Sequence, residues 1–498
     1  MSSKRVIIIG SGLGGLSCGV ILAKNGYEVT VLEQALQVGG CLQCFTRRGA
    51  RFETGMHFIG SAAPGQTLNR LMHYLDLLPD VGLSRLDPMG YDVVAMCGER
   101  FAFANGRDAF IEQMSARFPH QRDNLVRYYD LIERVAGASS LHSLKYAESD
   151  AAINTEYQLR PIDQVIDQLI TDPLLARVLV GNLPLYAAER GKTPFSTHAF
   201  IMDFYNQSAY RIVGGSDAIA QLMQRSIERL GGRVLTRHRV TRITCDDTHA
   251  TGVEVNGEQW FPADYVISDA HPMRTLDLID SRLIRPAFRR RVSSMPQTVG
   301  GFSVYLDFKP GEVPYMNSNY YGYHDTPWDC EIYDEQSWPK GFLYMHFCQQ
   351  DNPQWAHTGV ILSYMHMRDV ERWAGTHVGR RGDDYEKFKI EHAERLLDAV
   401  ERHFPHLRDH IKHYYTSTPL TYRDYTGTEA GSMYGIAKDV NLGVAGRVPH
   451  RTRIPNVLQT GQNINSHGML GVLVGTIVTC SELLTARHIY QDIIQANQ

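Results

Sequence analysis

The chain has 498 residues, of which 43% are hydrophobic and 21% charged, and its formal net charge is −4. This length suits two domains or one large composite domain, and the composition is typical of a globular protein with a sizeable core. Nucleic-acid binding favours a strongly basic surface, so the slightly acidic balance predicts no nucleic-acid partner.

No targeting or anchoring segment is expected. The first apolar run, residues 6–9, is too short for the core of a secretory signal. Residues 468–480 are strongly apolar, but a spanning helix needs about 20 such residues, so we expect a buried helix there. The eight cysteines show no disulfide spacing, which suits a reducing compartment. We therefore expect a cytoplasmic protein, with peripheral contact at the inner face of the membrane as its closest approach to lipid.

The chain begins with the pattern strand, glycine turn, helix, strand. Residues 6–9 are a β-branched run typical of a strand buried on both faces, and residues 16–25 are small and apolar, as in a helix packed on a sheet. Gly26 stands where a helix stop belongs, and residues 28–32 are the second expected strand. Apolar residues at helical spacing then predict mainly helices over residues 68–180.

Strands and helices alternate again after Gly214-Gly215. A helix and four short strands are expected in the next block, at 218–230, near 234, and at 240–243, 253–255 and 265–268. Aromatic and β-branched residues predict three further strands, at 302–306, 342–345 and 360–362. A helix with Ala393, Leu397, Val400 and Phe404 on one face should follow, and residues 454–490 return to strand, glycine turn and helix.

The clearest functional signal is the glycine turn Gly10-Ser11-Gly12-Leu13-Gly14-Gly15. Alone such a motif is weak, but here a strand precedes it, a helix follows it and Glu33 ends the next strand. Gly10 permits the tight turn, Gly12 lets the backbone approach a pyrophosphate, and Gly15 allows close helix–strand packing. The helix N-terminus offers N–H groups to phosphates, and Glu33 can accept bonds from ribose hydroxyls. The sequence therefore predicts a dinucleotide-binding unit.

Later motifs resemble one group of flavoproteins. The relevant stretches are Val38-Gly39-Gly40, residues 52–60 (Phe-Glu-Thr-Gly-Met-His-Phe-Ile-Gly), residues 210–215 and residues 454–471. Together they are similar to motifs of the phytoene desaturase, carotenoid isomerase and retinol saturase group, and residues 52–60 are most like the retinol saturase branch. The resemblance covers both ends and the middle of the chain, whereas residues 75–205 and 300–420 match weakly.

The resemblance implies FAD as the cofactor. The implied contact residues are Gly10, Ser11, Gly12, Leu13, Gly14, Gly15, Glu33, Gln34, Gly39, Gly40, Arg47, Thr54, Gly55, Met56, His57, Val240, Gly461, Gln462, Asn463, Gly468, Met469, Leu470 and Gly471. Val240 would lie beside the adenine, and the helix from Gly468 would point at the flavin, whose reduced anion gains from a helix N-terminus. Glu53 and Asn463 stand where many relatives have Asp.

The resemblance also implies a fold. We expect an α/β protein with a discontinuous, Rossmann-like FAD-binding domain of the glutathione-reductase or amine-oxidase type, and an inserted mixed domain for the substrate. The expected bounds are 1–75, 206–290 and 420–498 for the FAD-binding domain, and 76–205 and 291–419 for the substrate-binding domain.

Catalytic side chains are harder to assign, because a flavin transfers hydride or electrons with little help from the protein. His57, Tyr434 and His467 are candidates near the expected flavin. His57 can donate a proton or polarise a substrate hydroxyl. The alternatives stay open: a hydrogen-bonded structural histidine at position 57, and simple lining or packing at the other two positions.

Three other clusters have competing interpretations. Cys41 and Cys44 form a C-x-x-C beside the expected flavin loop, which suggests a redox disulfide, although the usual motif opens a helix in a thioredoxin-like unit. His403, His406, His410 and His413 fall near one face of an expected helix, and His406 and His410 have the i, i+4 spacing of zinc ligands. Pro405 interrupts the pattern, however, and we expect no metal site. The basic run at residues 285–291 is either a solvated turn or a contact with anionic lipid.

The substrate is expected to be hydrophobic. Aromatic residues at 299–366, with Phe200, Phe204 and Tyr205, predict a pocket for an extended apolar molecule, with its entrance at residues 175–205. The resemblance implies a polyene or isoprenoid whose C=C or C–C bond reacts, by reduction as in retinol saturases. Three alternatives remain: carotenoid desaturation or cis–trans isomerisation, an amine-oxidase-like activity, and non-catalytic prenyl binding. No second dinucleotide fingerprint appears, so the electron donor or acceptor is open.

Overall fold

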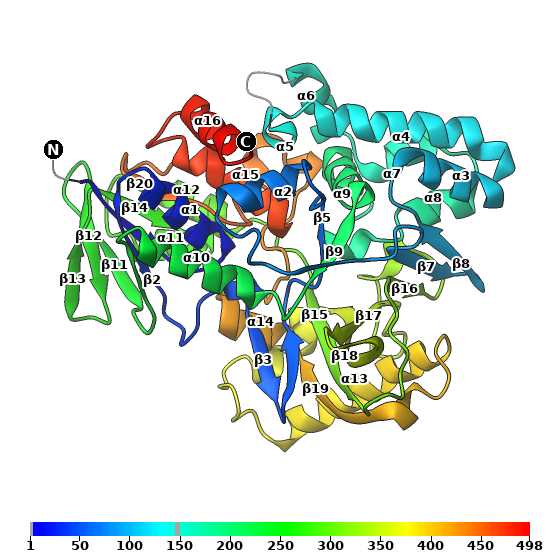
Figure 1. The fold of residues 1–498 in the computed structure, drawn as a ribbon. Coiled ribbons are helices and arrows are strands. Elements are labelled where there is room, and N and C mark those ends of the chain that lie inside the picture. The colour runs from blue at the N-terminus through cyan, green and yellow to red at the C-terminus, as the bar shows by residue number, and fades with distance from the viewer. Residues whose placement is uncertain (1–2, 145–149) are drawn as a thin grey trace.

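Two β-sheets organise the chain in a computed structural model that describes residues 3–144 and 150–498 (Figure 1). The first sheet is parallel throughout, with the strand order β10-β2-β1-β14-β20. Its strands are β1 (Arg5–Ile9), β2 (Glu28–Leu32), β10 (Arg233–Leu235), β14 (Tyr265–Ser268) and β20 (Val457–Gln459). Ile8 lies between Val31 and Ile267 in this sheet, and all three side chains are fully buried, as the β-branched runs predicted.

Both faces of the parallel sheet are covered by other elements. Successive side chains of a strand point to opposite faces, so the apolar strands present hydrophobic residues to both layers. Val6 and Ile8 pack against a layer of helices: α1 (Leu13–Lys24), α2 (Thr67–Tyr74), α10 (Asp217–Arg229), α15 (Gly468–Cys480) and α16 (Ala486–Gln495). Ile7 and Ile9 pack against a small antiparallel sheet and two helices: β11 (Val240–Cys245), β12 (Ala250–Val255), β13 (Gln259–Pro262), α11 (Pro272–Leu278) and α12 (Pro286–Ser293). Helix α15 is the buried helix expected at residues 468–480.

The second sheet has seven strands in the order β19-β15-β18-β17-β16-β7-β8, antiparallel except for the β16–β7 pair. They are β7 (Asp92–Met96), β8 (Glu99–Phe103), β15 (Gly300–Phe308), β16 (Asn319–Tyr323), β17 (Gly341–Gln349), β18 (Asn352–Met365) and β19 (Ile411–Ser417). One face packs on α13 (Asp383–Glu401), through Ala393, Leu397 and Val400 as expected. The other face packs on a helical layer: α3 (Arg107–Arg117), α4 (Arg122–Gly137), α6 (Ala151–Gln158), α7 (Ile162–Leu169), α8 (Pro173–Leu179) and α9 (Phe195–Gln207). The short helix α5 (Ser140–Ser143) lies against α4 and α15.

Two expectations about secondary structure need correction. The stretch 68–180 is mainly helical as expected, but it also contains three strands that were not expected: β6 (Leu83–Arg85), β7 and β8. Strand β6 pairs with β9 (Ala209–Ile212), and β7 pairs with β16 and β8 in the second sheet. Helix α13 ends at Glu401, so the four histidines at 403–413 do not share a helix face; His406 has a φ of 66° and His413 lies on β19. Among residues 3–144 and 150–498, no group of three or more His, Cys, Asp or Glu side chains is arranged to hold a metal.

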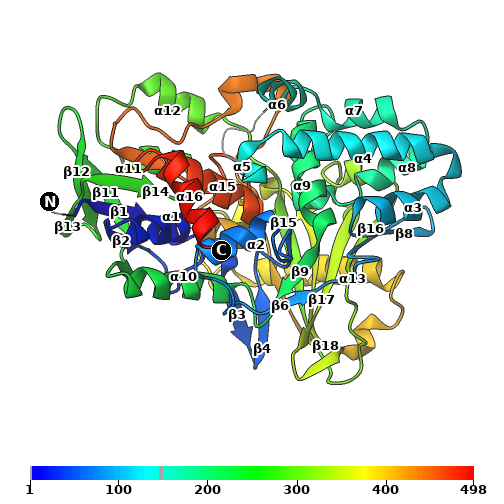
Figure 2. The same cartoon turned by 45° about the horizontal axis from the view of Figure 1, so that its top comes forward.

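A short connecting region joins the two sheets. Phe195 and Met202 on α9 pack in the helical layer, whereas Phe204 and Ile212 pack in the core beside the parallel sheet. The strand β9 (Ala209–Ile212) pairs with β5 (Ile59–Gly60) and β6, and α9 and β9 lie between the two parts in both views (Figures 1 and 2). The hairpin of β3 (Cys44–Arg47) and β4 (Ala50–Glu53) reaches from the first part to the second.

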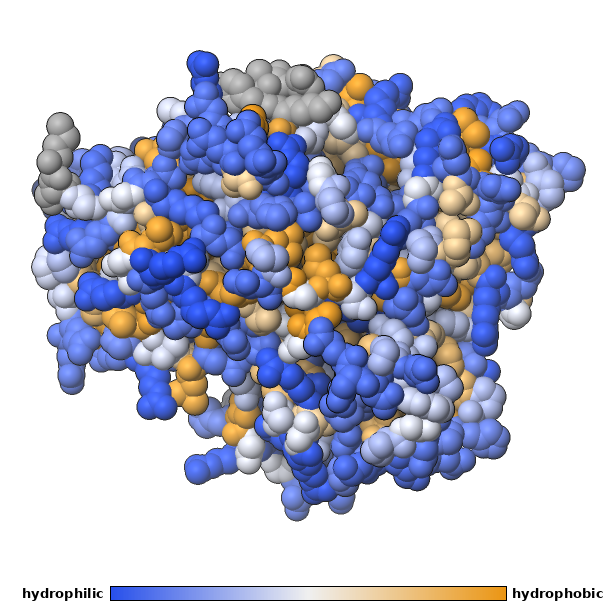
Figure 3. Space-filling model, in the orientation of Figure 1, coloured by the Kyte–Doolittle hydropathy of each residue, from blue (hydrophilic) through white to orange (hydrophobic). Residues whose placement is uncertain are grey.

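Polar residues cover most of the face shown in Figure 3, and hydrophobic residues are visible mainly toward its middle. Within the described parts of the chain, no helix is both long enough and apolar enough to cross a bilayer. The division into an FAD-binding and a substrate-binding domain stays a prediction.

Candidate functional site

The glycine turn between β1 and α1 is closed tightly. Gly10 has a φ of 93°, a left-handed conformation that favours glycine. A Cβ added to Gly15 would lie 2.2 Å from the carbonyl oxygen of Gly10, so any side chain there would force the turn and the helix apart. Helix α1 begins at Leu13 without a side-chain cap, so its first N–H groups need partners from outside the helix. This end of the helix is therefore suited to an anion.

Glu33 stabilises the glycine turn through hydrogen bonds, a role that the sequence did not predict. Its Oε2 accepts hydrogen bonds from the Ser11 backbone N–H at 2.9 Å and from the Ser11 hydroxyl at 2.6 Å. Its Oε1 accepts from the Ala35 N–H at 2.8 Å. The buried carboxylate thereby holds Ser11 of the turn against the end of β2. Its contact with ribose hydroxyls stays a prediction, for which Oε1 retains a lone pair.

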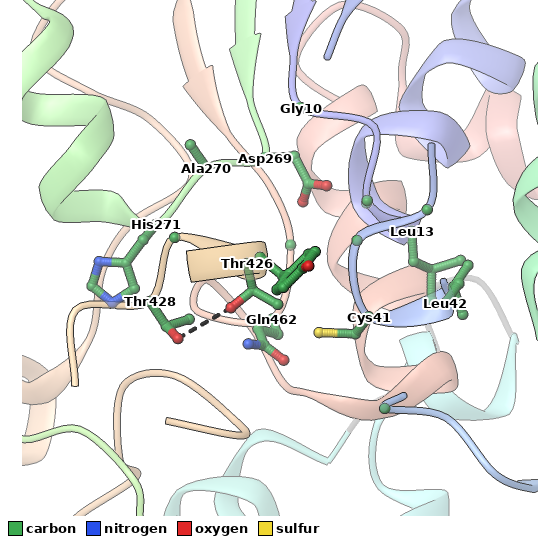
Figure 4. A pocket seen from close by; sticks show the side chains of 18 of the residues that line it. Gly10, Leu13, Cys41, Leu42, Asp269, Ala270, His271, Thr426, Thr428 and Gln462 are labelled. Carbon is green, nitrogen blue, oxygen red and sulfur yellow. Dashed lines mark hydrogen bonds between the residues drawn. The ribbon is translucent and has the colours of Figure 1, made fainter. Parts of the chain in front are cut away.

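A cavity of about 800 Å³ lies at the carboxyl ends of β1, β2 and β14, where α/β sheets bind their ligands. Eighteen of the residues expected to contact the cofactor line it: Gly10, Ser11, Gly12, Leu13, Gly14, Glu33, Gln34, Gly39, Gly40, Gly55, Met56, His57, Val240, Gly461, Gln462, Asn463, Gly468 and Met469. Figure 4 shows how segments far apart in the sequence meet here, with Leu13 and Cys41 on one side and Ala270 and His271 on the other.

Five of the expected contact residues do not line this cavity: Gly15, Arg47, Thr54, Leu470 and Gly471. Arg47 lies at the exposed end of β3, where its guanidinium is 5.6 Å from the centre of the Phe45 ring. The Thr54 hydroxyl donates to the Gln43 carbonyl oxygen at 2.7 Å and so fixes a neighbouring loop. Leu470 belongs to the hydrophobic core behind α15. Direct contact with a cofactor stays a prediction for these five residues.

The cavity also has linings that the sequence analysis missed. Asp269, Ala270 and His271 follow β14, and residues 422–428 come from α14 (Pro419–Thr426) and the turn after it. The first set had a usable signal, because residues directly after a parallel strand face the ligand crevice. The second set carries no motif and is brought to the cavity by tertiary packing; Figure 4 shows Thr426 and Thr428 there, joined by a 3.2 Å hydrogen bond.

His57 and Glu53 form a buried pair at the cavity. His57 lines the cavity, and its Nδ1 lies 3.5 Å from Oε2 of Glu53. Neither atom has a hydrogen-bond partner within the described parts of the chain. Burial raises the pKa of the Glu53 carboxyl, while His57 and Arg211 oppose that shift. Arg211 also donates to the His57 carbonyl oxygen at 3.1 Å. This carboxyl–imidazole arrangement can orient His57 and exchange a proton with it.

The rings of Tyr434 and His467 are in contact, with their centres 4.6 Å apart and their planes tilted by 39°. Tyr434 lines the cavity, and its hydroxyl donates to the Pro184 carbonyl oxygen at 2.8 Å, which ties it to the expected entrance segment. His467 lies behind Tyr434 rather than on the cavity wall. Burial lowers the pKa of His467 to about 3, and Lys438 acts in the same direction. His467 is therefore neutral and a poor proton donor, so packing is its best-supported role.

The C-terminal motif brings a second helix end to the cavity. Helix α15 begins at Gly468, whose φ is 72°, and Gly468 and Met469 line the cavity with the first turn of that helix. Asn463 has a separate anchoring role, because its Oδ1 accepts the N–H of Ile436 at 2.9 Å. The residue that replaces Asp in this motif thus fixes the backbone that follows Tyr434.

The two cysteines of the C-x-x-C are free thiols. Cys41 lines the cavity, and the Cys44 Sγ lies 3.7 Å from the Ser216 hydroxyl. Burial raises the pKa of both thiols to about 11. Thiols with such pKa values are protonated at neutral pH and are poor nucleophiles, which argues against a redox exchange with the cofactor.

The cavity fits a flavin dinucleotide on three counts. Two helix N-termini, those of α1 and α15, converge on it and favour negative charge. The backbone at Gly12, Gly14 and Gly461 leaves no room for side chains, which brings main-chain groups close to a ligand. Apolar side chains line another part of the same cavity. The fold and the cavity together are those of a flavin-dependent oxidoreductase.

Residues 13–323 match the family described as flavin containing amine oxidoreductase, and the chain belongs to this family. It is accordingly a flavin-dependent oxidoreductase, as expected. It is 29% identical to the all-trans-retinol 13,14-reductase of Rattus norvegicus over 98% of this chain and 86% of that protein. It is 24% identical to prolycopene isomerase 2 of an Oncidium hybrid cultivar, over 92% of this chain and 79% of that protein. The resemblance to the retinol saturase and carotenoid isomerase group is thereby confirmed.

Solved structures share the fold. An oxidoreductase from Methanosarcina mazei aligns with a TM-score of 0.65 at 17% identity, over 95% of this chain and 99% of that chain. Cyclohexylamine oxidase from Brevibacterium oxydans aligns with a TM-score of 0.62 at 16% identity, over 99% and 100% of the two chains. At these identities the likeness establishes the architecture, and it confirms the expected amine-oxidase type of fold.

Proposed function

We propose that this protein is an FAD-dependent oxidoreductase that reduces a carbon–carbon double bond of a hydrophobic polyene or isoprenoid. The observation that carries the proposal is that the dinucleotide turn, His57 and a set of apolar side chains line one cavity. The apolar lining residues are Phe58, Leu185, Tyr205, Leu343, Leu362 and Met433. The likeness to retinol 13,14-reductases over 98% of the chain supports a related substrate.

In this proposal the cavity residues hold FAD along its length. Main-chain groups of Gly12 and Gly14 and the N-terminus of α1 bind the pyrophosphate, with Gly39 and Gly40 opposite. The Val240 region lies beside the adenine, and the segments at 461–463 and 468–469 hold the flavin end. When bound and reduced, FAD supplies a hydride.

The protein's own residues donate the proton and position the substrate. Adding hydride to one carbon of a double bond leaves the other carbon in need of a proton, and His57 is the residue placed to give it. Glu53 orients the imidazole and can restore its proton. Tyr434 and Leu185 guide the apolar chain from the entrance segment at 175–205.

The proposal includes the remaining expectations about organisation. The FAD-binding domain comprises 1–75, 206–290 and 420–498, and the substrate-binding domain comprises 76–205 and 291–419. A substrate of this kind resides in lipid, so we propose a cytoplasmic protein that makes peripheral contact with the membrane. The electron donor is not identified.

A second candidate is a redox-neutral cis–trans isomerisation of a carotenoid, or its desaturation. The likeness to prolycopene isomerases favours it, and the same cavity would serve it. Amine oxidation predicts instead that the flavin is reduced by an amine. A non-catalytic prenyl-binding protein predicts that the purified protein is colourless.

The decisive experiment is anaerobic. The protein is purified, its visible spectrum is recorded, the flavin is reduced, and all-trans-retinol is added while the flavin band is followed. Return of the oxidised flavin with loss of retinol conjugation supports reduction of a double bond. A flavin that stays reduced rules out retinol as a substrate and favours isomerisation or another polyene. Absence of a flavin band contradicts the proposed cofactor.

A further inference from the structure

Asp269 occupies the centre of the cofactor cradle. It is the first residue after β14, and its backbone N–H donates to the Ile9 carbonyl oxygen at 2.8 Å, which pins it to the end of β1. Figure 4 shows its side chain pointing into the cavity toward the glycine turn. Cβ atoms built on Gly12, Gly14 and Gly461 would lie 2.4, 2.6 and 2.3 Å from its carboxyl oxygens. The carboxyl group therefore fills the space among the three glycines.

The partners of this carboxyl group are those of an anion site. The backbone N–H groups of Gly12 and Gly15 act on it to lower its pKa, at the end of α1 where a dinucleotide places its phosphates. The carboxyl thus shares its donors with the pyrophosphate, or lies next to the donors that the pyrophosphate uses. An ionised Asp269 would compete with the phosphates for these N–H groups and repel them.

The charged groups around Asp269 do not offset that repulsion. Glu33 approaches from β2 and adds negative charge, and the Cys41 thiol, which approaches from the segment at 40–42, is neutral. The bases that follow Asp269 in the chain are engaged elsewhere: His271 Nε2 lies 3.1 Å from the Gln297 side-chain oxygen, and Arg274 pairs with Glu429 at 2.7 Å. Burial, with the Coulomb contribution of Glu33, raises the pKa of the Asp269 carboxyl to about 7. The neutral acid is therefore accessible under physiological conditions.

We propose that Asp269 is a cofactor-binding residue that holds the dinucleotide as a neutral carboxylic acid, so that binding of FAD takes up one proton. This proposal rests on FAD being the cofactor. In the neutral form the carbonyl oxygen of the side chain accepts a loop N–H, and its O–H donates to a phosphate oxygen. No bond other than the O–H bond of Asp269 is made, and the proton comes from solvent.

The coupling of proton uptake to FAD binding determines how strongly the dissociation constant for FAD depends on pH. The phosphates of a dinucleotide are ionised throughout the range from pH 6 to 9, so the protein carries the titrating group. The dissociation constant for FAD should be flat well below pH 7 and approach a tenfold rise per pH unit above it, so that it increases about 50-fold between pH 7 and 9. An amide cannot ionise but keeps one acceptor and one donor, so Asp269→Asn should bind FAD with a flat profile at the wild-type affinity of low pH.

The test measures FAD binding to apoprotein by fluorescence quenching from pH 6 to 9, for wild type, Asp269→Asn and a control, Asp280→Asn. Asp280 is exposed and pairs with Arg242 away from the cavity, so this control should follow the wild-type profile. Calorimetry of wild type at pH 8 in two buffers of different ionisation enthalpy gives the proton uptake directly, and close to one proton per FAD is expected. That readout holds even if the Asn variant does not fold.

Three outcomes are decisive. A flat wild-type profile, or proton uptake near zero at pH 8, overturns the role of Asp269. A profile of Asp269→Asn that still follows wild type does the same, because another group would then be responsible. Failure to bind FAD at any pH refutes the proposed cofactor instead, and is distinguished from the first two results by the absence of any binding signal.

Discussion

Replacing His57 by glutamine should remove the proton donor while leaving the cofactor cradle in place. The imidazole lies at the cavity wall, and its Nδ1 faces Glu53 Oε2 at 3.5 Å. The two side chains are 9% and 7% exposed, so bulk water has little access to the pair. Glutamine has a similar volume and retains an N–H group, but it cannot transfer a proton at neutral pH.

The expected loss follows from what the pair does. A positioned general acid contributes about 10²–10⁴-fold to the rate, so His57→Gln should slow substrate reduction by that factor. Glu53→Gln keeps an acceptor for Nδ1 but removes the carboxylate, and a smaller loss of about tenfold is expected, equal to about 1.4 kcal/mol. Because Glu53 acts through His57, the double variant should be no slower than His57→Gln alone.

The assay is a single turnover in which reduced enzyme is mixed anaerobically with all-trans-retinol, and reoxidation of the flavin is followed by absorbance. Reduction of the flavin by dithionite and the affinity for FAD should be unchanged, which separates proton transfer from damage to the cradle. His406→Gln, at an exposed position, is the matched control. A rate for His57→Gln within threefold of wild type would refute the reasoning, as would losses in the double variant that multiply.

Three further results are expected. Gly15→Ala should abolish FAD binding, measured by flavin retention on gel filtration, because its Cβ would lie 2.2 Å from the Gly10 carbonyl oxygen; normal flavin content would contradict this. Glu33→Gln should weaken FAD binding about tenfold, because one hydrogen bond from Ser11 to a charged acceptor is lost; an unchanged titration would show that the turn holds without it. Burial raises the pKa of the Asp92 carboxyl to about 7, above its unfolded value of about 4, so the folded state holds the proton more tightly than the unfolded state. The free energy of unfolding of wild type should therefore fall by about 4 kcal/mol between pH 4 and 7, and that of Asp92→Asn should not show this fall. Urea unfolding measures both, and parallel pH profiles would rule this out.

Much of the cofactor cradle could be predicted because its chemistry depends on local backbone geometry. The glycines at 10–15, 39–40, 461 and 468 stand where the chain must turn tightly or approach a ligand, and these requirements leave a mark in the sequence. The parallel strands were equally visible as β-branched runs. The glycine positions and the β-branched runs can each be recognised from a few consecutive residues.

The parts of the site and the fold that the sequence did not predict depend on contacts between distant segments of the chain. Residues 422–428 reach the cavity only because α14 packs there, and nothing in their composition indicates it. The strands β7 and β8 were hidden in a stretch of helical periodicity, since β7 is stabilised by pairing with β16, more than 200 positions later in the chain, and β8 pairs with β7. Asp269 was not predicted as a site residue, although it directly follows a strand that was. Its position at the carboxyl end of a parallel strand indicates that it faces the ligand crevice.

The strand order of the parallel sheet has a consequence for synthesis on the ribosome. Strands β1 and β2 emerge first and can pair at once, but the partner on the far side of β1 arrives only with Tyr265–Ser268, and the last strand only with Val457–Gln459. At about 5–20 residues per second, the free edge of this nascent sheet stays unpaired for roughly tens of seconds. An unpaired edge of buried-type residues invites association with other chains. Efficient production should therefore depend on factors that shield nascent chains, and on a translation rate that keeps this interval short.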